Sequence, residues 1–344
     1  MPPEASAQSI LERYRPIVDA QVHRVLEGRA EVALYDVIRY HLGFADAGGK
    51  PADAAGGKRV RSAFCLLACE AAGGDAASAA AAGAAIELAH SFTLLHDDIA
   101  DHDETRRGRA TAWKLWGIGQ AITAGDAVYA LANLAAGGLE GQSSPEITLS
   151  VLRELNQAVL DVCEGQQLDI SYEGQYDLSQ ADYLRMVGLK TAALLRSACA
   201  IGAMIGGAGV ETAEALGSFG FGIGIAYQIQ DDMLGAWGDP EKMGKPVGSD
   251  LRRNKRTLPV ILALTGEDAD LRSRLRTSLE RGVSAEQAAE LAAAMAEKGI
   301  RLQCATMARG LLEDALGRLD RADLKMPAAA DLRTLASYLA ERTR

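Results

Sequence analysis

The chain of 344 residues has material for one large domain or two smaller ones. Hydrophobic residues make up 48% of it but aromatic residues only 5%, and the abundance of alanine favours close-packed helices over a β-sandwich. The net charge of −10 argues against nucleic acid as a partner, because binding to a phosphate backbone requires a basic surface.

The N-terminus lacks the charged and apolar regions of a signal peptide. No run of about 18 apolar residues is expected, because Glu87 and His90 interrupt the longest candidate. We therefore expect a cytoplasmic protein with no stable membrane anchor. The cysteines form no Cys-x-x-Cys pair and no even set, so we expect small, buried, reduced side chains. They are Cys65, Cys69, Cys163, Cys199 and Cys304.

Helix signals begin at the N-terminus, where residues 1–28 are expected to form a helix. A loop rich in Gly, Ala and Asp is expected over residues 44–58. Glycine pairs at 73–74 and 137–138 fall where helices should stop. Ser144-Pro145-Glu146 supplies a cap, a proline at the first helical position and an acid in the first turn. It precedes an apolar 3.6-residue rhythm that runs to Tyr172.

The second half of the chain continues in the same way. Ser179 with Asp182, and Ser284 with Gln287, predict helix N-caps, and Gly282 predicts a helix end. Residues 238–250 are rich in Gly, Pro and Lys and predict a second loop between two helices. No convincing strand alternation, internal repeat or domain boundary is found, so the sequence predicts a continuous all-α bundle over residues 1–344.

A first carboxylate cluster lies in LLHDDIADHDETRRGRAT, residues 94–111, at the end of an Ala-rich segment. Asp97 and Asp101 should stack on one helix face, with Asp98 about 100° round from Asp97. Like charges at this spacing destabilise a helix by roughly a few tenths of a kcal/mol, so a bound cation should offset them. Carboxylates suit Mg²⁺, which keeps several waters and binds substrate phosphates as well.

A second pair, Asp231 and Asp232, ends another apolar helix within YQIQDDMLGAWGD. The position four residues after Asp231 is Gly235, so this pair has one carboxylate fewer, although Asp239 follows as a more distant candidate. Solvated acidic helix ends are the alternative for either cluster taken alone. Two aspartate pairs that each end an apolar helix favour metal binding.

Two histidines flank the first cluster and raise the alternative of a transition-metal site. His96 and His102 lie on different sides of the helix from each other and from Asp97. This spacing favours polar neighbours over ligands.

With both clusters present, the chain resembles the trans-isoprenyl diphosphate synthases of the polyprenyl synthetase family. The resemblance covers roughly residues 50–265 and rests on five blocks in the family's order. They are GGKRVR (56–61), HSFTLLHDDIADHDETRRG (90–108), CEGQQLDI (163–170), KTAAL (190–194) and YQIQDDMLGAWGDPEKMGKPVGSDLRRNKRT (227–257). The chain departs from the family pattern at Gly235, where many members carry a third aspartate. A similar Asp-Asp-x-x-Gly form occurs among bacterial members, so we interpret it as a variant.

The resemblance implies an all-α, single-domain bundle around a deep central cavity, usually a homodimer. It implies head-to-tail condensation of isopentenyl diphosphate with an allylic diphosphate, which is dimethylallyl, geranyl or farnesyl diphosphate. Mg²⁺, about three ions per active site and replaceable by Mn²⁺, would hold the allylic diphosphate between the aspartate motifs and draw charge off the leaving group. The implied metal ligands are Asp97, Asp98, Asp101, Asp231 and Asp232.

Matching family positions imply two further sets of substrate contacts. The allylic diphosphate would also meet Arg106, Lys190 and Lys245, the last in a glycine-rich loop that could close over it. Isopentenyl diphosphate would meet Gly57, Lys58, Arg61, His90 and Arg107. Lys58, Arg59 and Arg61 alone would more simply form a solvated basic turn, but the other blocks favour a diphosphate pocket. His90 lies about 10.5 Å before Asp97 along one helix, so that helix can serve both substrates.

The implied reaction needs no Ser, Cys or His nucleophile. Loss of diphosphate leaves an allylic cation, which the double bond of isopentenyl diphosphate attacks, and the released diphosphate takes the departing proton. The side-chain oxygens of Thr191 and Gln228 are the implied dipoles near that cation.

Product length in this family depends on bulk below the first aspartate motif. Thr93 lies one turn before Asp97, about 6 Å along the helix, and Phe92 precedes it. Phenylalanine at 92 resembles the short-chain members and implies a C15 or C20 product, although a plain core role is the alternative for any phenylalanine.

Two other functions fit the same fold. A class I terpene cyclase ionises allylic diphosphates but has no use for an isopentenyl site, so Lys58, Arg61, His90 and Arg107 favour the synthase. A non-catalytic regulatory subunit of a synthase would tend to lose an aspartate motif, and only Gly235 points that way.

Overall fold

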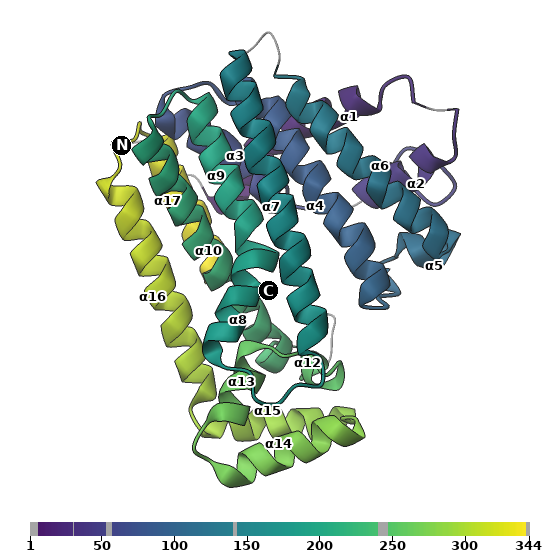
Figure 1. The fold of residues 1–344 in the computed structure, drawn as a ribbon, viewed down its shortest axis with the longest axis vertical. Helices are drawn as coiled ribbons and strands as arrows, with labels where there is room; N and C mark the ends of the chain where they lie inside the picture. The colour runs from purple at the N-terminus through teal and green to yellow at the C-terminus, as the bar shows by residue number, and fades with distance from the viewer. Residues whose placement is uncertain (1–5, 30, 53–56, 140–142, 240–246, 342–344) are drawn as a thin grey trace. The chain divides into compact units, whose positions relative to one another are not determined.

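The computed structural model describes residues 6–29, 31–52, 57–139, 143–239 and 247–341, and nearly all of them lie in helices or the loops between helices (Figure 1). This confirms the predicted all-α class.

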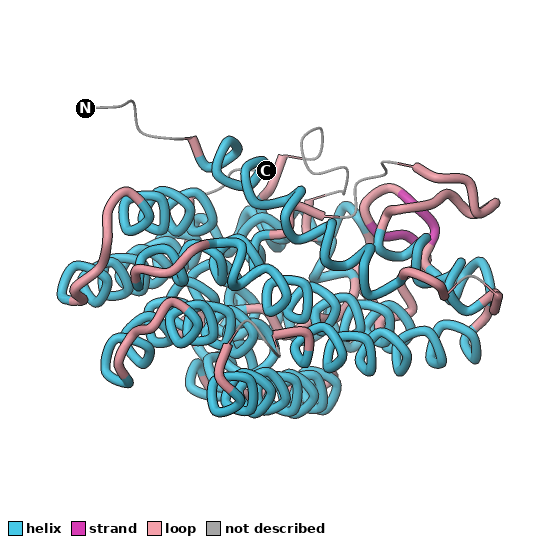
Figure 2. Tube along the Cα trace, turned by 90° about the horizontal axis from the view of Figure 1, so that it is seen from above, coloured by secondary structure: helices cyan, strands magenta, loops and turns pink. Residues whose placement is uncertain are grey.

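A single two-stranded ladder among the described residues, β1 (Thr105–Arg106) with β2 (Arg109–Ala110), is too short to show as alternation in the sequence (Figure 2). Arg107 and Gly108 join the strands with φ of 53° and 75°, the backbone that a tight two-residue hairpin turn requires.

The backbone packing divides the chain into two compact units. Unit 1 comprises residues 1–160, 194–217 and 322–334. Unit 2 comprises residues 161–193, 218–321 and 335–344. The single domain expected over residues 1–344 remains a prediction.

Unit 1 contains the N-terminal helices and the helix that carries the first aspartate cluster. Its elements are α1 (Ala7–Leu26), α2 (Leu34–Leu42), α3 (Val60–Ala72), η1 (Ala76–Ala79), α4 (Ala80–Ala100), α5 (Ala112–Trp116), α6 (Ile118–Gly137), and parts of α7 (Pro145–Tyr172), α9 (Ala193–Ile205) and α10 (Val210–Trp237). The helix predicted over residues 1–28 is observed as α1, which begins at Ala7 and ends at Leu26, and residues 1–5 lie outside the described residues. The predicted helix stops are confirmed, since α3 ends before Gly73 and α6 ends at Gly137. The loop expected over 44–58 is confirmed over residues 44–52 and 57–58, and residues 53–56 lie outside the described residues.

Small residues let the helices of unit 1 approach closely. A Cβ atom at Gly202 would lie 2.0 Å from the carbonyl oxygen of Cys65, and one at Gly206 would lie 2.4 Å from that of Cys69. The backbones of α9 and α3 therefore touch where Cys65 and Cys69 are buried, as expected. Cys163 contradicts the expectation of five buried thiols, because it is exposed on α7 next to the buried Val162.

Unit 2 contains the other parts of α7 and α10 and most of the C-terminal helices. Its further elements are α8 (Gln180–Val187), the π-helical turn η2 (Gly188–Ala192), α12 (Ser249–Arg252), α13 (Leu258–Thr265), α14 (Ala269–Arg281), α15 (Ala285–Glu297) and α16 (Ile300–Arg321), while α17 (Ala328–Ala340) is divided between the units. The loop expected over 238–250 is wrong at its end, because α12 begins at Ser249. Residues 240–246 lie outside the described residues.

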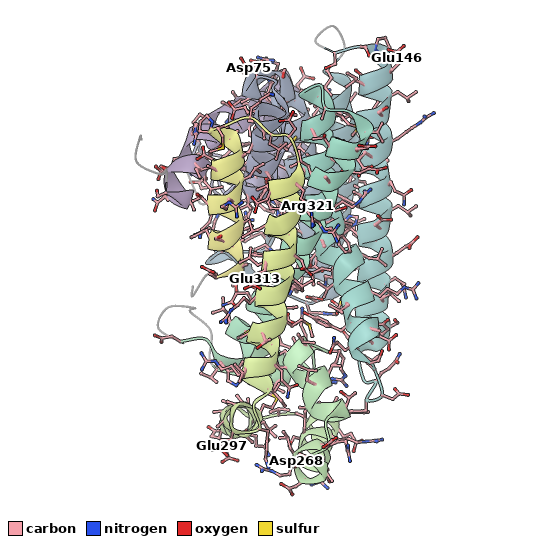
Figure 3. All side chains as sticks on the ribbon, turned by 90° about the vertical axis from the view of Figure 1, so that its left-hand side faces the viewer. Asp75, Glu146, Asp268, Glu297, Glu313 and Arg321 are labelled. Carbon is pink, nitrogen blue, oxygen red and sulfur yellow. The ribbon has the colours of Figure 1, made fainter. Side chains whose placement is uncertain are left out.

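Capping interactions fix the helix ends of unit 2 much as the sequence predicts. Capping boxes join Ser179 to Asp182 and Ser284 to Gln287, and α14 ends before Gly282. Asp268 caps α14 and lies 2.5 Å from the ammonium of Lys298, at the end of α15. Figure 3 shows Asp268 and Glu297 at the same end of this helix pair, and Glu313 and Arg321 along the exposed side of α16.

Two segments, Ala76–Ala100 and Gln180–Ile205, are long and apolar enough to cross a membrane by length and composition. This corrects the expectation that the described chain holds no such segment. Within their apolar windows, 72% and 67% of the residues are buried inside the protein, as in the core helices of soluble proteins. The absence of a membrane anchor therefore stays a prediction.

Candidate active site

The first aspartate cluster occupies the last turn of α4, in unit 1. The carboxylate of Asp98 is 2% exposed, and burial raises its pKa, while Arg106 of β1 opposes that shift. Arg106 donates from Nε to Asp98 Oδ1 at 2.5 Å, and its Nη2 lies 3.6 Å from Asp97 Oδ2. Asp101 ends the helix, with its N–H donating to the carbonyl of Asp97 at 2.8 Å. Arg106 therefore contacts both Asp97 and Asp98, and Asp101 lies near enough to Asp98 for its charge to raise the pKa of that carboxylate.

One oxygen in this cluster keeps its capacity for a ligand. Asp98 Oδ2 is buried and has no hydrogen-bond partner among the described residues. A buried carboxylate oxygen without a partner is costly unless a cation or a donor reaches it. The donor chemistry of the cluster, oxygen only, suits Mg²⁺.

A group of cationic side chains, the candidate cationic pocket, lies in the same unit, where the segment before α3 meets the turn after α4. A Cβ atom at Gly57, which has a φ of 101°, would lie 2.7 Å from Nη2 of Arg107. The Arg107 guanidinium therefore lies against the bare backbone of Gly57, and a side chain at this position would displace it. Lys58 beside it is exposed.

Arg61 and His90 complete the pocket. Arg61 Nη1 lies 3.1 Å from His90 Nε2, and because arginine has only donors, Nε2 must accept and the proton must sit on Nδ1. Burial, reinforced by Arg61 and Arg107, holds the pKa of His90 well below its usual range, so the ring is neutral. Arg61 Nε is a buried donor without a partner among the described residues, which suits an anionic ligand.

Arg59, in the same GGKRVR block, has a different role. Its side chain is 4% exposed, donates to Asp19 Oδ1 at 2.8 Å and lies 3.8 Å from Glu87 Oε2. The block therefore divides into one arginine neutralised in the core and two cations, Lys58 and Arg61, at the pocket.

The second aspartate pair lies on the part of α10 within unit 2. Asp232 is buried, and its carboxylate accepts three hydrogen bonds: from Tyr183 at 2.7 Å, from the Leu258 N–H at 3.0 Å and from Gln228 Nε2 at 2.9 Å. Burial raises its pKa to about 7 despite these donors. Since a carboxylate has about four acceptor positions, the protein uses most of those on Asp232. Asp231 is only partly buried, and is the more accessible of the pair.

Gly235 has a specific neighbour. A Cβ atom there would lie 2.0 Å from Oδ2 of Asp250, the acid in the first turn of α12. Asp250 also raises the pKa of Asp232, which places its charge near that carboxylate. The space that a third aspartate would need at 235 is therefore filled by a carboxylate from another segment.

Lys190 and Thr191 lie on the π-helical turn η2, a geometry that recurs at functional sites. A Cβ atom at Gly165 would lie 2.2 Å from the backbone nitrogen of Lys190, so α7 contacts this turn directly. Lys190 Nζ lies 2.5 Å from Asp169 Oδ2, and Thr191 Oγ1 donates to Gln228 Oε1 at 2.9 Å. The two predicted dipoles therefore contact each other, and Gln228 in turn holds Asp232.

Three residues of these networks were not singled out from the sequence. Asp169 and Asp250 lie in the blocks CEGQQLDI and GSDLRRNKRT, so the family pattern could have indicated them. Tyr183 gave no signal beyond an aromatic residue in a helix. Lys245, by contrast, is a predicted contact that lies outside the described residues.

The described part of the chain offers little support for a site elsewhere. Within the described part of the chain, no three His, Cys, Asp or Glu side chains converge enough to hold a metal unaided. A groove of about 700 Å³ lies on α7 in unit 1, lined by Ser150, Arg153, Glu154, Asn156, Gln157, Leu160 and Met204 of α9. None of the predicted site residues lines it, so the side-chain chemistry locates the candidate site better than the groove does.

The model of the Polyprenyl synthetase family matches residues 51–297, more than half of the chain. The chain belongs to this family. It is 44% identical over 262 residues to a geranylgeranyl diphosphate synthase of Mycobacterium tuberculosis, covering 76% of this chain and 74% of the relative. It is 36% identical over 353 residues to a (2E,6E)-farnesyl diphosphate synthase of Mycobacterium bovis, covering 99% and 97%. The crystal structure of a polyprenyl synthetase from Streptomyces coelicolor A3(2) matches with a TM-score of 0.88 and 38% identity, covering 96% and 98%.

These similarities confirm the family resemblance and the enzyme class. The protein is an isoprenyl diphosphate synthase, which is a prenyltransferase. They favour the synthase over the cyclase and the regulatory subunit. The roles of the individual site residues stay predictions.

The neutral His90 predicts an acid-dependent loss of stability. Below about pH 6.5, the usual histidine pKa, residue 90 binds a proton in the unfolded chain but not in the folded protein. The free energy of unfolding therefore falls as pH falls, by up to about 1.4 kcal/mol per pH unit. His90→Gln keeps an acceptor for Arg61 and removes this titration. We expect the free energy of unfolding, measured by denaturant titration, to fall less between about pH 6 and pH 5 in this variant than in the unsubstituted protein. An equal fall in both proteins would contradict the neutral state of His90. The control is His102→Asn, a substitution at an exposed histidine.

The hydrogen bond from Tyr183 to Asp232 predicts that Tyr183→Phe destabilises the protein. Removing one donor to a buried carboxylate should lower the free energy of unfolding by about 1.5–3 kcal/mol. If Asp232 belongs to a metal site, divalent-cation affinity should also fall, by roughly 10–100-fold. Denaturant titration and calorimetry with Mn²⁺ measure the two effects. Tyr172→Phe, in the same core, is the control because its hydroxyl is not bonded to Asp232.

Proposed function

We propose that this synthase condenses isopentenyl diphosphate head-to-tail with an allylic diphosphate to give an all-trans C15 or C20 prenyl diphosphate. One observation carries the proposal. Helix α4 bears His90 of the cationic pocket and Asp97 and Asp98 of the carboxylate cluster, so two opposite kinds of diphosphate recognition lie along one helix of unit 1. A cyclase would need only the carboxylates.

The cationic pocket fits a diphosphate that keeps its charge through the reaction. Arg61 and Arg107 present forked donors that match phosphate oxygens, and neutral His90 adds no charge that varies near neutral pH. We assign isopentenyl diphosphate to this pocket, with Lys58 and the Gly57 backbone beside it.

The carboxylates fit a divalent metal. We propose Asp97, Asp98, Asp101, Asp231 and Asp232 as the residues that hold Mg²⁺, or Mn²⁺ in its place, with about three ions per site as in the family pattern. Asp98 Oδ2 supports this, because it is buried without a partner, whereas Asp232 has about one acceptor position left. Bound metal would supply charge neutralisation at the leaving diphosphate.

The remaining residues act on the allylic group. When the bond from C1 to the diphosphate oxygen breaks, the electron pair leaves with the diphosphate and C1 becomes cationic. The oxygens of Thr191 and Gln228, fixed by their mutual hydrogen bond, offer preorganised dipoles to that charge. Lys190 contacts Asp169, and a diphosphate would compete for its ammonium.

Incubation with Mg²⁺, isopentenyl diphosphate and each of the C5, C10 and C15 allylic diphosphates tests this function. We expect a C15 or C20 prenyl diphosphate, abolished by a chelator and reduced by about 10²–10³-fold in Asp97→Asn, whose side chain keeps its size but loses its charge. A cyclic hydrocarbon formed from allylic substrate alone would establish the cyclase instead. No turnover from a folded protein would favour the regulatory subunit.

We propose a homodimer, supported by apolar side chains left at the surface of neighbouring helices in unit 1. Leu115 of α5 is 42% exposed, and Ile118, Ile122 and Leu134 of α6 are 53%, 43% and 58% exposed. Exposed apolar side chains on consecutive helices support an interface where they form one continuous patch. Light scattering should give about twice the chain mass of 36.3 kDa, and Leu134→Glu should shift the mass toward one chain. A single-chain mass for the unsubstituted protein would contradict the dimer.

We also propose a cytoplasmic location, to be tested by cell fractionation. The free thiols support it, since a reducing compartment keeps cysteines unpaired.

A further inference from the structure

Two arginines are buried among the described residues, and they differ in what compensates their charge. Arg59 in unit 1 is paired with Asp19 and Glu87. Arg256, just before α13 in unit 2, is 2% exposed and bonds no carboxylate among the described residues. A guanidinium taken out of water without an acid beside it costs free energy. The place of Arg256 therefore needs a reason other than stability.

Carbonyl oxygens and an aromatic ring hold the Arg256 guanidinium. Its Nε donates to the carbonyl of Gln175 at 2.5 Å, and its Nη1 donates to the carbonyl of Asn254 at 3.0 Å and to Asn254 Oδ1 at 2.9 Å. The guanidinium also lies over the ring of Tyr176, 4.9 Å from its centroid. Gln175 and Tyr176 lie between α7 and α8, and α8 packs against α13 (Figure 1). Arg256 therefore fastens the segment before α13 to the segment before α8, within unit 2.

The side chain of Arg256 also closes the turn that joins α12 to α13. Asn254 has a left-handed backbone with a φ of 57°, and its N–H donates to the carbonyl of Leu251 at 3.1 Å. The N–H of Lys255 donates to the carbonyl of Asp250 at 3.0 Å. Because Arg256 reaches back to Asn254, side-chain and backbone hydrogen bonds fix the conformation of this turn together.

Each end of the turn carries a group that acts on Asp232. At the start, Asp250 fills the space over Gly235, and its charge raises the pKa of Asp232. At the end, the N–H of Leu258 donates to Asp232 Oδ2 at 3.0 Å. This N–H belongs to the first turn of α13 and has no partner within the helix. The conformation of the turn therefore determines where both groups meet the carboxylate.

We propose that Arg256 is a positioning residue for the second aspartate pair, and that it acts by holding the turn over residues 250–258 against the segment after α7. The inference rests on the proposed function, in which this pair holds a divalent metal for the allylic diphosphate. Without the guanidinium, the turn loses its attachment to that segment, and the Leu258 N–H no longer has a fixed place. Asp232 then loses its orientation, whereas the cationic pocket in unit 1 keeps all of its residues.

The test compares Arg256→Ala with Arg276→Ala. Arg276 of α14 is the matched control, because its guanidinium also lies 4.9 Å from the centroid of the Tyr176 ring, but its side chain is 60% exposed and pairs with Glu280. Calorimetric titration with Mn²⁺ in the presence of inorganic diphosphate should show about 10-fold weaker binding in Arg256→Ala and unchanged binding in Arg276→Ala.

Steady-state kinetics supply a second measurement. In Arg256→Ala, the KM for the allylic diphosphate should rise by about 10-fold, while the KM for isopentenyl diphosphate stays unchanged. A general loss of stability would lower the amount of active enzyme and would not separate the two KM values.

Two milder variants keep the test decisive if Arg256→Ala unfolds, as circular dichroism would show. Arg256→Lys keeps the charge but loses the forked donors, so it should show the same losses. Asn254→Gly suits the left-handed backbone and removes only Oδ1, so its losses should be smaller and in the same direction.

The outcomes separate this inference from the function on which it rests. Unchanged Mn²⁺ binding and unchanged KM values in folded Arg256→Lys would overturn the positioning role, as would equal losses in Arg276→Ala. Absence of prenyl diphosphate from the unsubstituted protein would overturn the proposed function instead.

Discussion

Two buried carboxylates constrain the rest of this structure, because an uncompensated buried charge costs more than a marginally stable protein can tolerate. Asp98 is compensated by Arg106, which requires the chain to reverse directly after α4. Asp232 is compensated by Tyr183, Gln228 and the first N–H of α13, which requires α8 and α13 to meet α10. The short hairpin and the start of α13 are therefore consequences of keeping acids in an alanine-rich interior.

The hairpin after α4 links the two halves of substrate recognition in unit 1. Arg106 and Arg107 are adjacent, but the turn sends the first guanidinium to the carboxylates and the second to Gly57. The left-handed backbone of Arg107 is the conformational cost of that split, since such φ values are uncommon for residues with a Cβ. An acidic protein thus concentrates cations locally, while Asp19 and Glu87 neutralise the neighbouring Arg59 in the core.

Features set by local chemistry could be predicted from the sequence, and features set by distant contacts could not. The caps at Ser179 and Ser284 and the proline start of α7 depend on neighbouring residues and were predicted correctly. The aspartate clusters and their arginine were found from spacing and family pattern. The π-helical turn at Lys190 lies against Gly165 of another helix, and the exposure of Cys163 depends on which face of α7 is covered, so neither could be derived from neighbouring residues in the sequence.

Gly235 illustrates how a motif can lose a residue without losing a charge. Taken along the chain, the second aspartate motif lacks its third acid, which would suggest a weaker site. In the folded unit, the carboxylate of Asp250 from α12 fills the space over Gly235, and its negative charge raises the pKa of Asp232. An aspartate at 235 would have to displace that carboxylate, so the two arrangements exclude each other. The number of acids near a metal site is therefore a property of the fold, because an acid supplied by a separate segment does not appear in the spacing of the motif.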